Sequence, residues 1–351
     1  MHGHLLEPCR RRVIAVSSLG WGVLQELFRI PILNLPVYGY GLMLVLGVWA
    51  AIELSRRMSE RVGINGDHFM TMGMLALFAG VVGARLSHVA ENLDVYTSDT
   101  RSAWENFKAA IDISSGGLTF YGGFLLATPT LIGYAIWRKI PIRLGMDIVA
   151  PCLMIGLAFG RVGCLLNGCC WGQPTDSVLG VEFPYGSPPY IDAAERGEIA
   201  VPPRLLQPGT RGPLPKSKDD VRKSAELREL ASHEHSPSVH PTQIYSTINA
   251  LLIAAVCLMF FTLRRSAGQA FSLMLILYGI GRFTLETLRI EPVRGPASVG
   301  FSFSMWVSVG VFTAGILSWL VFQRFYRPAP FTTARKPEID AAGPAPIVEA
   351  A

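Results

Sequence analysis

The chain has 351 residues, of which 50% are hydrophobic and only 16% are charged, and its mean hydropathy is +0.36. Soluble globular domains carry about 25% charged residues, so this composition argues against a soluble domain and for a membrane protein. The formal net charge is +5, but the basic residues flank apolar stretches instead of forming one stripe. Membrane topology and anionic membrane lipids explain that distribution, and no nucleic-acid partner is expected.

Several apolar stretches, each about 18–24 residues long, can cross a hydrocarbon core of roughly 30 Å at 1.5 Å per residue. Backbone amides in lipid must be satisfied within their own segment, so each stretch is predicted to be a helix. The predicted spans are, in chain order, Tyr38–Leu54, Phe69–Ala90, Leu118–Trp137, Ile148–Leu166, Gln243–Leu263, Phe271–Leu288 and Phe303–Phe322. The predicted fold class is an all-α integral membrane protein with about seven transmembrane helices and a small extracytoplasmic head region.

Basic clusters orient the predicted bundle. They follow the first, third, fifth and seventh spans and comprise Arg56, Arg57, Arg61, Arg138, Lys139, Arg143, Arg264, Arg265, Arg324 and Arg327. All fall on one side, which the positive-inside rule makes cytoplasmic, so the N-terminus is predicted to be extracytoplasmic and the C-terminus cytoplasmic. Arg10, Arg11 and Arg12 disagree, because they would lie outside. Val13–Phe28 is interpreted as a short interfacial helix, or else the start codon is assigned too early; no small-residue cleavage site supports a signal peptide.

The remaining segments divide the chain into regions. Residues 1–37 are an N-terminal extension, residues 38–327 form the transmembrane domain, and residues 328–351 are a Pro/Ala-rich cytoplasmic tail that is predicted to be disordered. The connection over about residues 172–239 is rich in proline and charge, so it is predicted to be an external head insert with a mobile middle near Gly209–Lys218. Glu91–Ser115 is predicted to include one amphipathic surface helix.

One arginine lies inside the fourth predicted span, where an ionisable residue is costly and asks for a reason. The segment GLAFGRVGCLLNGCCWG places Arg161 between Gly160 and Gly163, and Asn167 follows near the outer end. A lone arginine can reach the head groups or pair with a carboxylate. The flanking glycines also favour another interpretation, since they let a ligand or a second backbone come close.

The sixth span carries YGIGRFTLETLRIEP, in which Tyr278, Arg282 and Glu286 are spaced i, i+4, i+8 and share one helix face. Arg282 and Glu286 can pair at this spacing, which makes their burial tolerable. The pair either staples helices together or holds an arginine ready for an anion. In the second case Arg161 and Arg282, on different helices, would clamp one phosphate, because guanidinium matches phosphate oxygens in a bidentate way.

Two further segments carry candidate polar groups. Glycine pairs bracket Tyr121 in SSGGLTFYGGFLLA, which indicates either a re-entrant segment that presents the hydroxyl or an interfacial aromatic residue. The fifth span opens with HPTQIY, where His240 is either a helix-entry polar group or a ligand-binding residue.

Three of the six cysteines, Cys164, Cys169 and Cys170, cluster near the outer end of the fourth span. Vicinal cysteines lack the usual two-residue ligand spacing, so no metal is predicted there. The cluster is interpreted as packing cysteines or as a structural disulfide in an oxidising outer compartment.

The segments YGYGLML, GARLSH, GGLTFYGG, FGRVGCLLNGCCWG, HPTQIY and YGIGRFTLETLR, in this order from about Tyr38 to Arg289, resemble the phosphatidylglycerol–prolipoprotein diacylglyceryl transferases of bacterial inner membranes. Each segment is weak alone, but their order on the predicted spans is specific. The resemblance implies transfer of a diacylglyceryl group from phosphatidylglycerol to the lipobox cysteine thiol of a prolipoprotein signal peptide, with release of glycerol phosphate. It implies a bacterial inner-membrane enzyme surrounded by membrane lipids, with no cofactor and no metal.

The resemblance also implies roles for individual residues. Arg161 and Arg282 would grip the phosphate and stabilise the leaving group, and Glu286 would orient Arg282. Tyr121 stands where some members have a histidine that is a candidate base; an ordinary tyrosine, with a pKa near 10, would need the arginines' field or would only position lipid. The residues expected to bind phosphatidylglycerol are Arg161, Asn167, Tyr40, Tyr278, Arg282 and His240.

Two other classes of protein stay open at this point. One is a membrane transporter whose arginines line a path, although transporters usually show repeats with matching broken helices, and no strong repeat is visible here. The other is an inactive paralogue that binds anionic lipid, prompted by Tyr121 and by Cys164, which replaces an asparagine of some members.

Overall fold

The computed structural model describes residues 14–15, 26–30, 35–97, 102–112, 117, 119–209, 212–289 and 301–327. The chain divides into two compact units. The first unit comprises Met1–Ala51, Cys152–Ala254 and Met274–Gly315. The second comprises Ile52–Pro151, Ala255–Leu273 and Ile316–Ala351.

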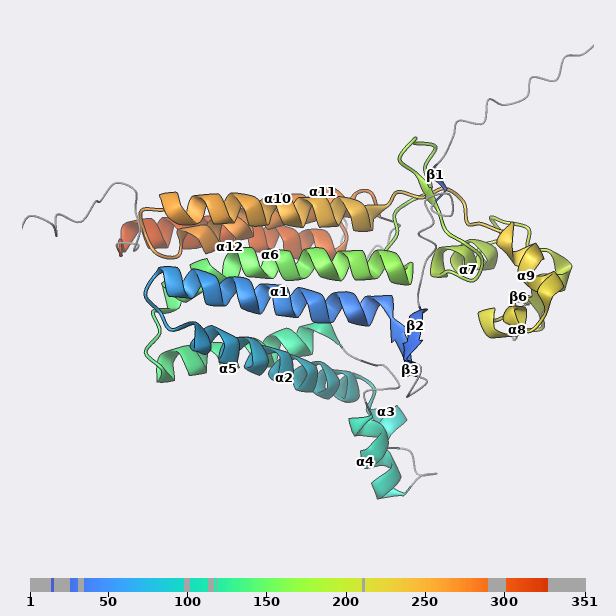
Figure 1. The fold of residues 1–351 in the computed structure, drawn as a ribbon, viewed down its shortest axis with the longest axis horizontal. Coiled ribbons are helices and arrows are strands. Elements are labelled where there is room, and N and C mark those ends of the chain that lie inside the picture. The colour runs from blue at the N-terminus through green and yellow to red at the C-terminus, as the bar shows by residue number, and fades with distance from the viewer. Residues whose placement is uncertain are drawn as a thin grey trace, which may run out of the picture. The chain divides into compact units, whose positions relative to one another are not determined.

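Each predicted span forms a helix. A helix pairs all backbone amides within the segment, which is what an apolar stretch in lipid requires. The helices are α1 (Gly39–Arg61), α2 (Gly66–Glu91), α5 (Phe120–Trp137), α6 (Ile142–Asn167), α10 (Thr242–Leu263), α11 (Gln269–Glu286) and α12 (Phe303–Arg324) (Figure 1). Among the described residues, α2, α6, α10 and α12 are long and apolar enough to cross a membrane. The structure is therefore mostly helical and consistent with an all-α membrane protein, and the crossing by α1, α5 and α11 stays a prediction.

In the second unit α2 and α5 pack side by side (Figure 1). Glycines allow the close approach: a Cβ on Gly83 would lie 2.4 Å from the Gly122 carbonyl oxygen, and one on Gly123 would lie 2.8 Å from that of Gly80. Small residues that let backbones approach are a common basis of helix association in membranes. This contact explains the second glycine pair of GGLTFYGG, and it fixes the helix that begins next to Tyr121.

The second unit also holds a buried ion pair between Asp147 of α6 and Arg264, which follows α10. The Arg264 Nε and Asp147 Oδ2 atoms are 2.8 Å apart, and both side chains are 0% exposed. Asp147 also accepts hydrogen bonds from the backbone N–H groups of Gly268, Ala270 and Phe271, at 2.7, 2.9 and 3.1 Å. A carboxylate at a helix N-terminus satisfies free amides and suits the helix dipole, so Asp147 fastens the start of α11.

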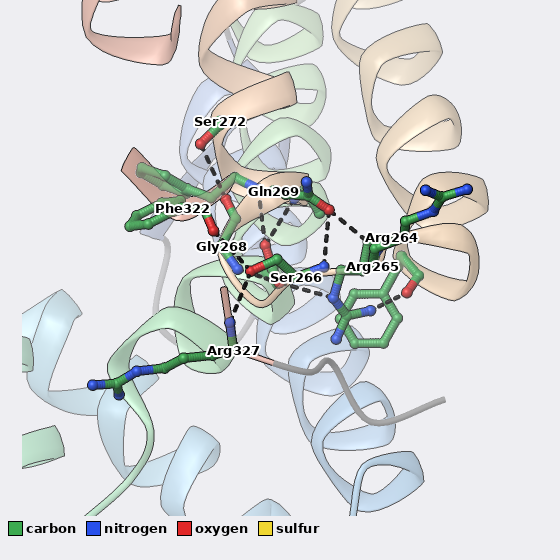
Figure 2. Close-up of polar contacts among 12 residues, drawn as sticks. Arg264, Arg265, Ser266, Gly268, Gln269, Ser272, Phe322 and Arg327 are labelled. Carbon is green, nitrogen blue, oxygen red and sulfur yellow. Dashed lines mark hydrogen bonds and ion pairs between the residues drawn. The ribbon is translucent and has the colours of Figure 1, made fainter. Parts of the chain in front are cut away.

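Neighbouring polar groups complete the turn before α11 (Figure 2). The Gln269 carbonyl oxygen Oε1 accepts from the backbone N–H groups of Arg265 and Ser266, at 3.1 and 3.0 Å. The Ser266 hydroxyl donates to the Phe322 carbonyl and accepts from the Arg327 N–H, at 3.0 and 3.3 Å. Arg264, one of the basic residues used to orient the predicted bundle, is thus part of a buried structural network.

Residues 172–239 fold into short elements in the first unit: β4 (Val181–Glu182), α7 (Pro188–Glu195), the 3₁₀ turn η2 (Pro203–Leu205), the hairpin strands β5 (Leu206–Gln207) and β6 (Leu214–Pro215), α8 (Lys218–Arg222) and α9 (Ala225–Ser232). They enclose a small core of Tyr185, Tyr190, Leu205, Val221 and Ala231. The Tyr190 hydroxyl donates to Glu234 at 3.1 Å, and burial raises the pKa of Tyr190 above its usual range. The segment is therefore built around its own core. The stretch near Gly209–Lys218, which is predicted from the sequence to be mobile, contains the strand β6.

Of two predictions about short flanking segments, the structure contradicts one and confirms the other. The interfacial helix over Val13–Phe28 is wrong where that stretch is described, because β1 (Ile14–Ala15) pairs in parallel with β4 and β2 (Glu26–Ile30) pairs antiparallel with β3 (Leu35–Tyr38). The surface helix is present as α4 (Ala103–Ile111), whose start carries a capping box of Ser102 and Glu105, after the short α3 (Leu93–Tyr96). The three N-terminal arginines and residues 328–351 lie outside the described part of the chain.

Candidate active site

The predicted i, i+4 pair is present on α11. Arg282 Nη1 lies 2.9 Å from Glu286 Oε2, and Arg282 Nη2 donates a 2.6 Å hydrogen bond to the Ser304 hydroxyl of α12. The Glu286 side chain is 3% exposed and that of Arg282 is 19% exposed. Burying a charge is tolerable when an opposite charge and further hydrogen bonds accompany it, and here both are supplied. The pair holds one face of the Arg282 guanidinium and leaves part of the group accessible.

Glu286 also serves a second arginine. Arg289 Nη1 lies 3.7 Å from Glu286 Oε2, and the Ser302 hydroxyl donates to Glu286 Oε1 at 3.4 Å. The backbone of Arg289 is bridged to Gly172, and its carbonyl accepts from Gln173 Nε2 at 2.9 Å. No role is predicted for Arg289 from the sequence, but its i, i+3 spacing from Glu286 in the ETLR segment is typical of an ion pair on one helix face.

Arg161 on α6 adds a positive charge that no described acidic residue pairs with. Its guanidinium makes no hydrogen bond or ion pair to any residue that the structure describes, and it is close enough for its charge to interact with Arg282, Tyr40 and Cys170. Two arginines near each other repel, and an uncompensated charge at membrane depth is costly. This cluster therefore favours an anion as the missing partner.

Gly163 explains how α1 comes close to this arginine. A Cβ at Gly163 would lie 3.1 Å from Tyr40 Cδ2 and 3.4 Å from Tyr40 Cα, so the glycine lets the start of α1 rest on α6. For Gly160, on the other side of Arg161, no described atom beyond its own turn of α6 lies within 4 Å of the position of a Cβ. The two flanking glycines thus differ: one admits a backbone, and the other borders open space.

The end of α6 is fastened to the start of α10. Thr242 Oγ1 donates to the Cys170 carbonyl at 2.6 Å, and Gln243 Nε2 donates to the Cys169 carbonyl at 2.8 Å. The His240 carbonyl accepts from the Gly172 N–H at 2.9 Å, while His240 Nδ1 is buried with no hydrogen-bond partner among the described residues. The sequence HPTQ therefore supplies structural contacts together with one ring nitrogen that a ligand or water can satisfy.

The structure brings most of the predicted residues into one unit. Tyr278 interacts electrostatically with Arg282, and Asn167, the last residue of α6, makes a side-chain contact with Cys169. Tyr121 is the second residue of α5 and belongs to the other unit, where its side chain is 54% exposed. Its predicted part in catalysis stays a prediction.

These features define a class of protein: a helical membrane protein in which Glu286 pairs with Arg282 and Arg289, and Arg161 of α6 adds a further positive charge near Arg282. A model of the prolipoprotein diacylglyceryl transferase family matches residues 25–321, and the chain belongs to this family. The resemblance seen in the motifs is confirmed.

Several relatives carry the name phosphatidylglycerol–prolipoprotein diacylglyceryl transferase. The protein of Clostridium tetani is 29% identical over 294 residues, which are 84% of this chain and 94% of that protein. That of Burkholderia cenocepacia is 31% identical over 299 residues, covering 80% of this chain and 89% of the relative. A third, numbered 2 in Clostridium perfringens, is 26% identical over 296 residues, covering 84% and 93%. The similarity thus extends over nearly the whole length of these relatives.

Proposed function

We propose that this protein is a transferase of the bacterial inner membrane that moves a diacylglyceryl group from phosphatidylglycerol to the lipobox cysteine of prolipoproteins. The observation that carries the proposal is Arg161, a guanidinium on α6 without a counter-ion among the described residues, near Arg282, which Glu286 holds. An anionic phospholipid head group supplies the absent charge. The names of the relatives state phosphatidylglycerol, prolipoprotein and the diacylglyceryl group.

The reaction fits the charge of the site. The acceptor sulfur forms a bond to the glyceryl carbon, the bond from that carbon to the phosphate oxygen breaks, and glycerol phosphate leaves with the electron pair. A phosphodiester carries one negative charge and a phosphomonoester about −1.5 to −2 at neutral pH, so negative charge grows as the bond breaks. Arg161 and Arg282 stabilise that growth, since fixed donors aimed at developing charge are worth most in a water-poor site.

The other residues have positioning roles in this proposal. Glu286 fixes the rotamer of Arg282, and Tyr278 on the same face of α11 offers a hydroxyl to the lipid head group. Tyr40, Asn167 and His240 Nδ1, which has no hydrogen-bond partner in the described part of the chain, bind the remaining polar atoms of phosphatidylglycerol. Tyr121 positions lipid or assists removal of the thiol proton.

We also propose the topology that the basic clusters predict. All seven helices cross the membrane, with an extracytoplasmic N-terminus, a cytoplasmic C-terminus and residues 172–239 as an outer head. The head and the outer helix ends then meet the exported precursor, while a diacyl substrate enters from the bilayer. Labelling of cysteines introduced in α9 and after Arg324 with a membrane-impermeant maleimide tests this: α9 should react from the outside and the other position should not.

The test of function uses purified protein in vesicles that contain phosphatidylglycerol, with a synthetic lipobox peptide as acceptor. Mass spectrometry should show a peptide mass increase of one diacylglyceryl group together with released glycerol phosphate. A peptide with serine in place of the cysteine should gain nothing. If the folded protein forms no adduct under conditions in which the Clostridium tetani relative does, the proposal is wrong, and a transporter or an inactive lipid-binding paralogue replaces it.

A further inference from the structure

The thiols of Cys164, Cys169 and Cys170 gather where α6 ends. Their sulfur atoms all lie within 4.8 Å of one another, and all three cysteines are free and half-buried. A zinc ion with Zn–S bonds of about 2.3 Å in tetrahedral geometry separates its sulfur ligands by about 3.8 Å. The three sulfurs therefore need to move together by no more than about 1 Å to share one zinc ion.

The backbone explains how two vicinal cysteines can face a third. α6 ends at Asn167, Gly168 adopts φ +71°, and the Cys169 N–H bonds the Cys164 carbonyl at 3.0 Å. Cys170 then adopts φ +63°, in the left-handed region that is uncommon for a residue with a side chain. Such strain persists where surrounding contacts impose it, and it is concentrated at functional sites.

Contacts from α10 hold this turn in place. The carbonyls of Cys169 and Cys170 are bound by Gln243 and Thr242, both of which are buried. Outer contacts that fix the ligand-bearing backbone are typical of metal sites, where they orient the ligands. A disulfide would require only two sulfurs to be adjacent, and packing cysteines would require none. Neither alternative explains why α10 holds the backbone that brings all three sulfurs together.

Charge and ligand type favour a soft divalent metal. Three thiolates with one zinc ion carry a net charge of −1, and Arg161 precedes Cys164 by three residues on α6, so a guanidinium group neighbours the cluster on the same helix. Thiolate sulfur prefers zinc over the hard cations magnesium and calcium. Three protein ligands also leave a fourth position open, which is the arrangement of catalytic rather than structural zinc sites.

We propose that Cys164, Cys169 and Cys170 bind zinc through three thiolates and that the fourth position takes the acceptor thiol of the prolipoprotein. The second half rests on the proposed function. On coordination the acceptor thiol loses its proton to solvent; its sulfur then attacks the glyceryl carbon, and the electron pair of the broken carbon–oxygen bond leaves with glycerol phosphate. Zinc is not oxidised or reduced. A thiol that coordinates a metal ion is deprotonated outright, so the zinc would supply the thiolate that the transfer needs.

Metal binding is tested first, without any activity assay. Protein purified without chelators should contain about one zinc per chain, and the zinc-free protein should bind Co²⁺ with a thiolate-to-cobalt charge-transfer absorption. Cys164→Ser, Cys169→Ser and Cys170→Ser should each lose this absorption. Cys152→Ser and Cys257→Ser, at buried cysteines outside the cluster, are the matched controls and should keep it.

A second measurement covers variants that fail to fold. In the wild-type protein Zn²⁺ should protect all three clustered cysteines from iodoacetamide, and a chelator should restore their reaction, as mapped by mass spectrometry. Absence of both zinc and cobalt binding overturns the proposal. So does a disulfide between two of the three cysteines in the protein isolated from its membrane.

The acceptor role is tested by adding lipobox peptide to the cobalt-loaded protein. The charge-transfer band should increase with the cysteine peptide and stay unchanged with its serine counterpart. Transfer should fall about 30-fold at pH 7 on zinc removal, because a free thiol with a pKa near 8.5 is only about 3% thiolate there. An unchanged spectrum with undiminished transfer by the zinc-free enzyme overturns the acceptor role. A changed spectrum without any adduct leaves the metal site standing and rejects the proposed transfer.

Discussion

Two buried arginine–carboxylate pairs in the described part of the chain differ in how their charges are balanced. Asp147 and Arg264 are both 0% exposed, and Asp147 also accepts hydrogen bonds from backbone amides of Gly268 and of the first turn of α11. Glu286 and Arg282 are 3% and 19% exposed, and two further guanidinium groups, of Arg289 and Arg161, stand near them. The first pair balances its charge internally, whereas the second leaves positive charge in excess.

This difference in charge balance distinguishes a structural ion pair from a binding site. A closed pair whose oxygens all have partners is explained by the fold alone. An open cluster with more guanidinium than carboxylate groups is explained only when an anion is added. Four substitutions, taken from the largest expected effect to the smallest, can break or sharpen this distinction.

Asp147→Asn should destabilise the protein by about 3–5 kcal/mol, because it leaves Arg264 buried without its partner and weakens the bonds to the start of α11. Thermal unfolding in a fixed detergent checks this. The double substitution Asp147→Asn with Arg264→Met should recover much of the loss, since the uncompensated charge is removed. An unchanged melting temperature in the single variant would show that this pair is dispensable.

Arg161→Ala should lower the transfer rate by about 10²–10³-fold, equivalent to about 2.7–4 kcal/mol, with little change in melting temperature. The guanidinium has no hydrogen-bond or ion-pair partner in the described part of the chain, so the fold loses nothing direct. Arg161→Lys should stay impaired because an ammonium group cannot make the bidentate contact. Arg143→Ala, on the same helix and bound to the Phe325 carbonyl, is the control that should keep its rate; equal loss in both variants would refute a specific role for Arg161.

Glu286→Gln should lower kcat by about 10²-fold and change KM for phosphatidylglycerol much less. Arg282 keeps its charge but loses the contact that fixes its geometry, and displacement of a catalytic group by about 1 Å costs this much. In an Arg282→Ala background the same substitution should add little further loss, because the two residues act as a unit. Full additivity of the two losses would show that Glu286 acts independently of Arg282.

Gly163→Ala should reduce transfer by less than about tenfold. The new Cβ would meet Tyr40 at 3.1 Å, so a shift of a few tenths of an ångström is needed, well below the 1 Å that costs about 10²-fold. Gly160→Ala is the matched control one turn away, since nothing lies within 4 Å of its Cβ position. Initial rates of the two variants under identical conditions decide whether the close approach of α1 to α6 matters.

Sequence reasoning located the helices well because a membrane span is a local property of the chain. The prediction Gln243–Leu263 differs from α10 by one residue, and Phe303–Phe322 differs from α12 by two. It also predicted the Arg282–Glu286 pair, since i, i+4 spacing fixes that contact. Local patterns of this kind do not predict contacts between segments that are distant in sequence.

Three features that the sequence did not reveal show the physical reason. Arg264 looked like a cytoplasmic flanking charge, because nothing near it in sequence revealed that Asp147 of α6 would bury it. The strands β1 and β2 replaced a predicted helix through pairing with β4 and β3. Cys169 and Cys170 lack the usual ligand spacing, and only the left-handed turn after α6 brings their sulfurs to that of Cys164.

The uncompensated charge of Arg161 has a consequence for turnover on the proposed function. A guanidinium that no described residue neutralises behaves like a fixed group in an ion exchanger, which releases one anion most easily when another takes its place. Release of glycerol phosphate is then coupled to the arrival of the next anionic lipid. The fraction of phosphatidylglycerol in the surrounding bilayer would set the rate at which the product leaves as well as the rate at which the donor binds.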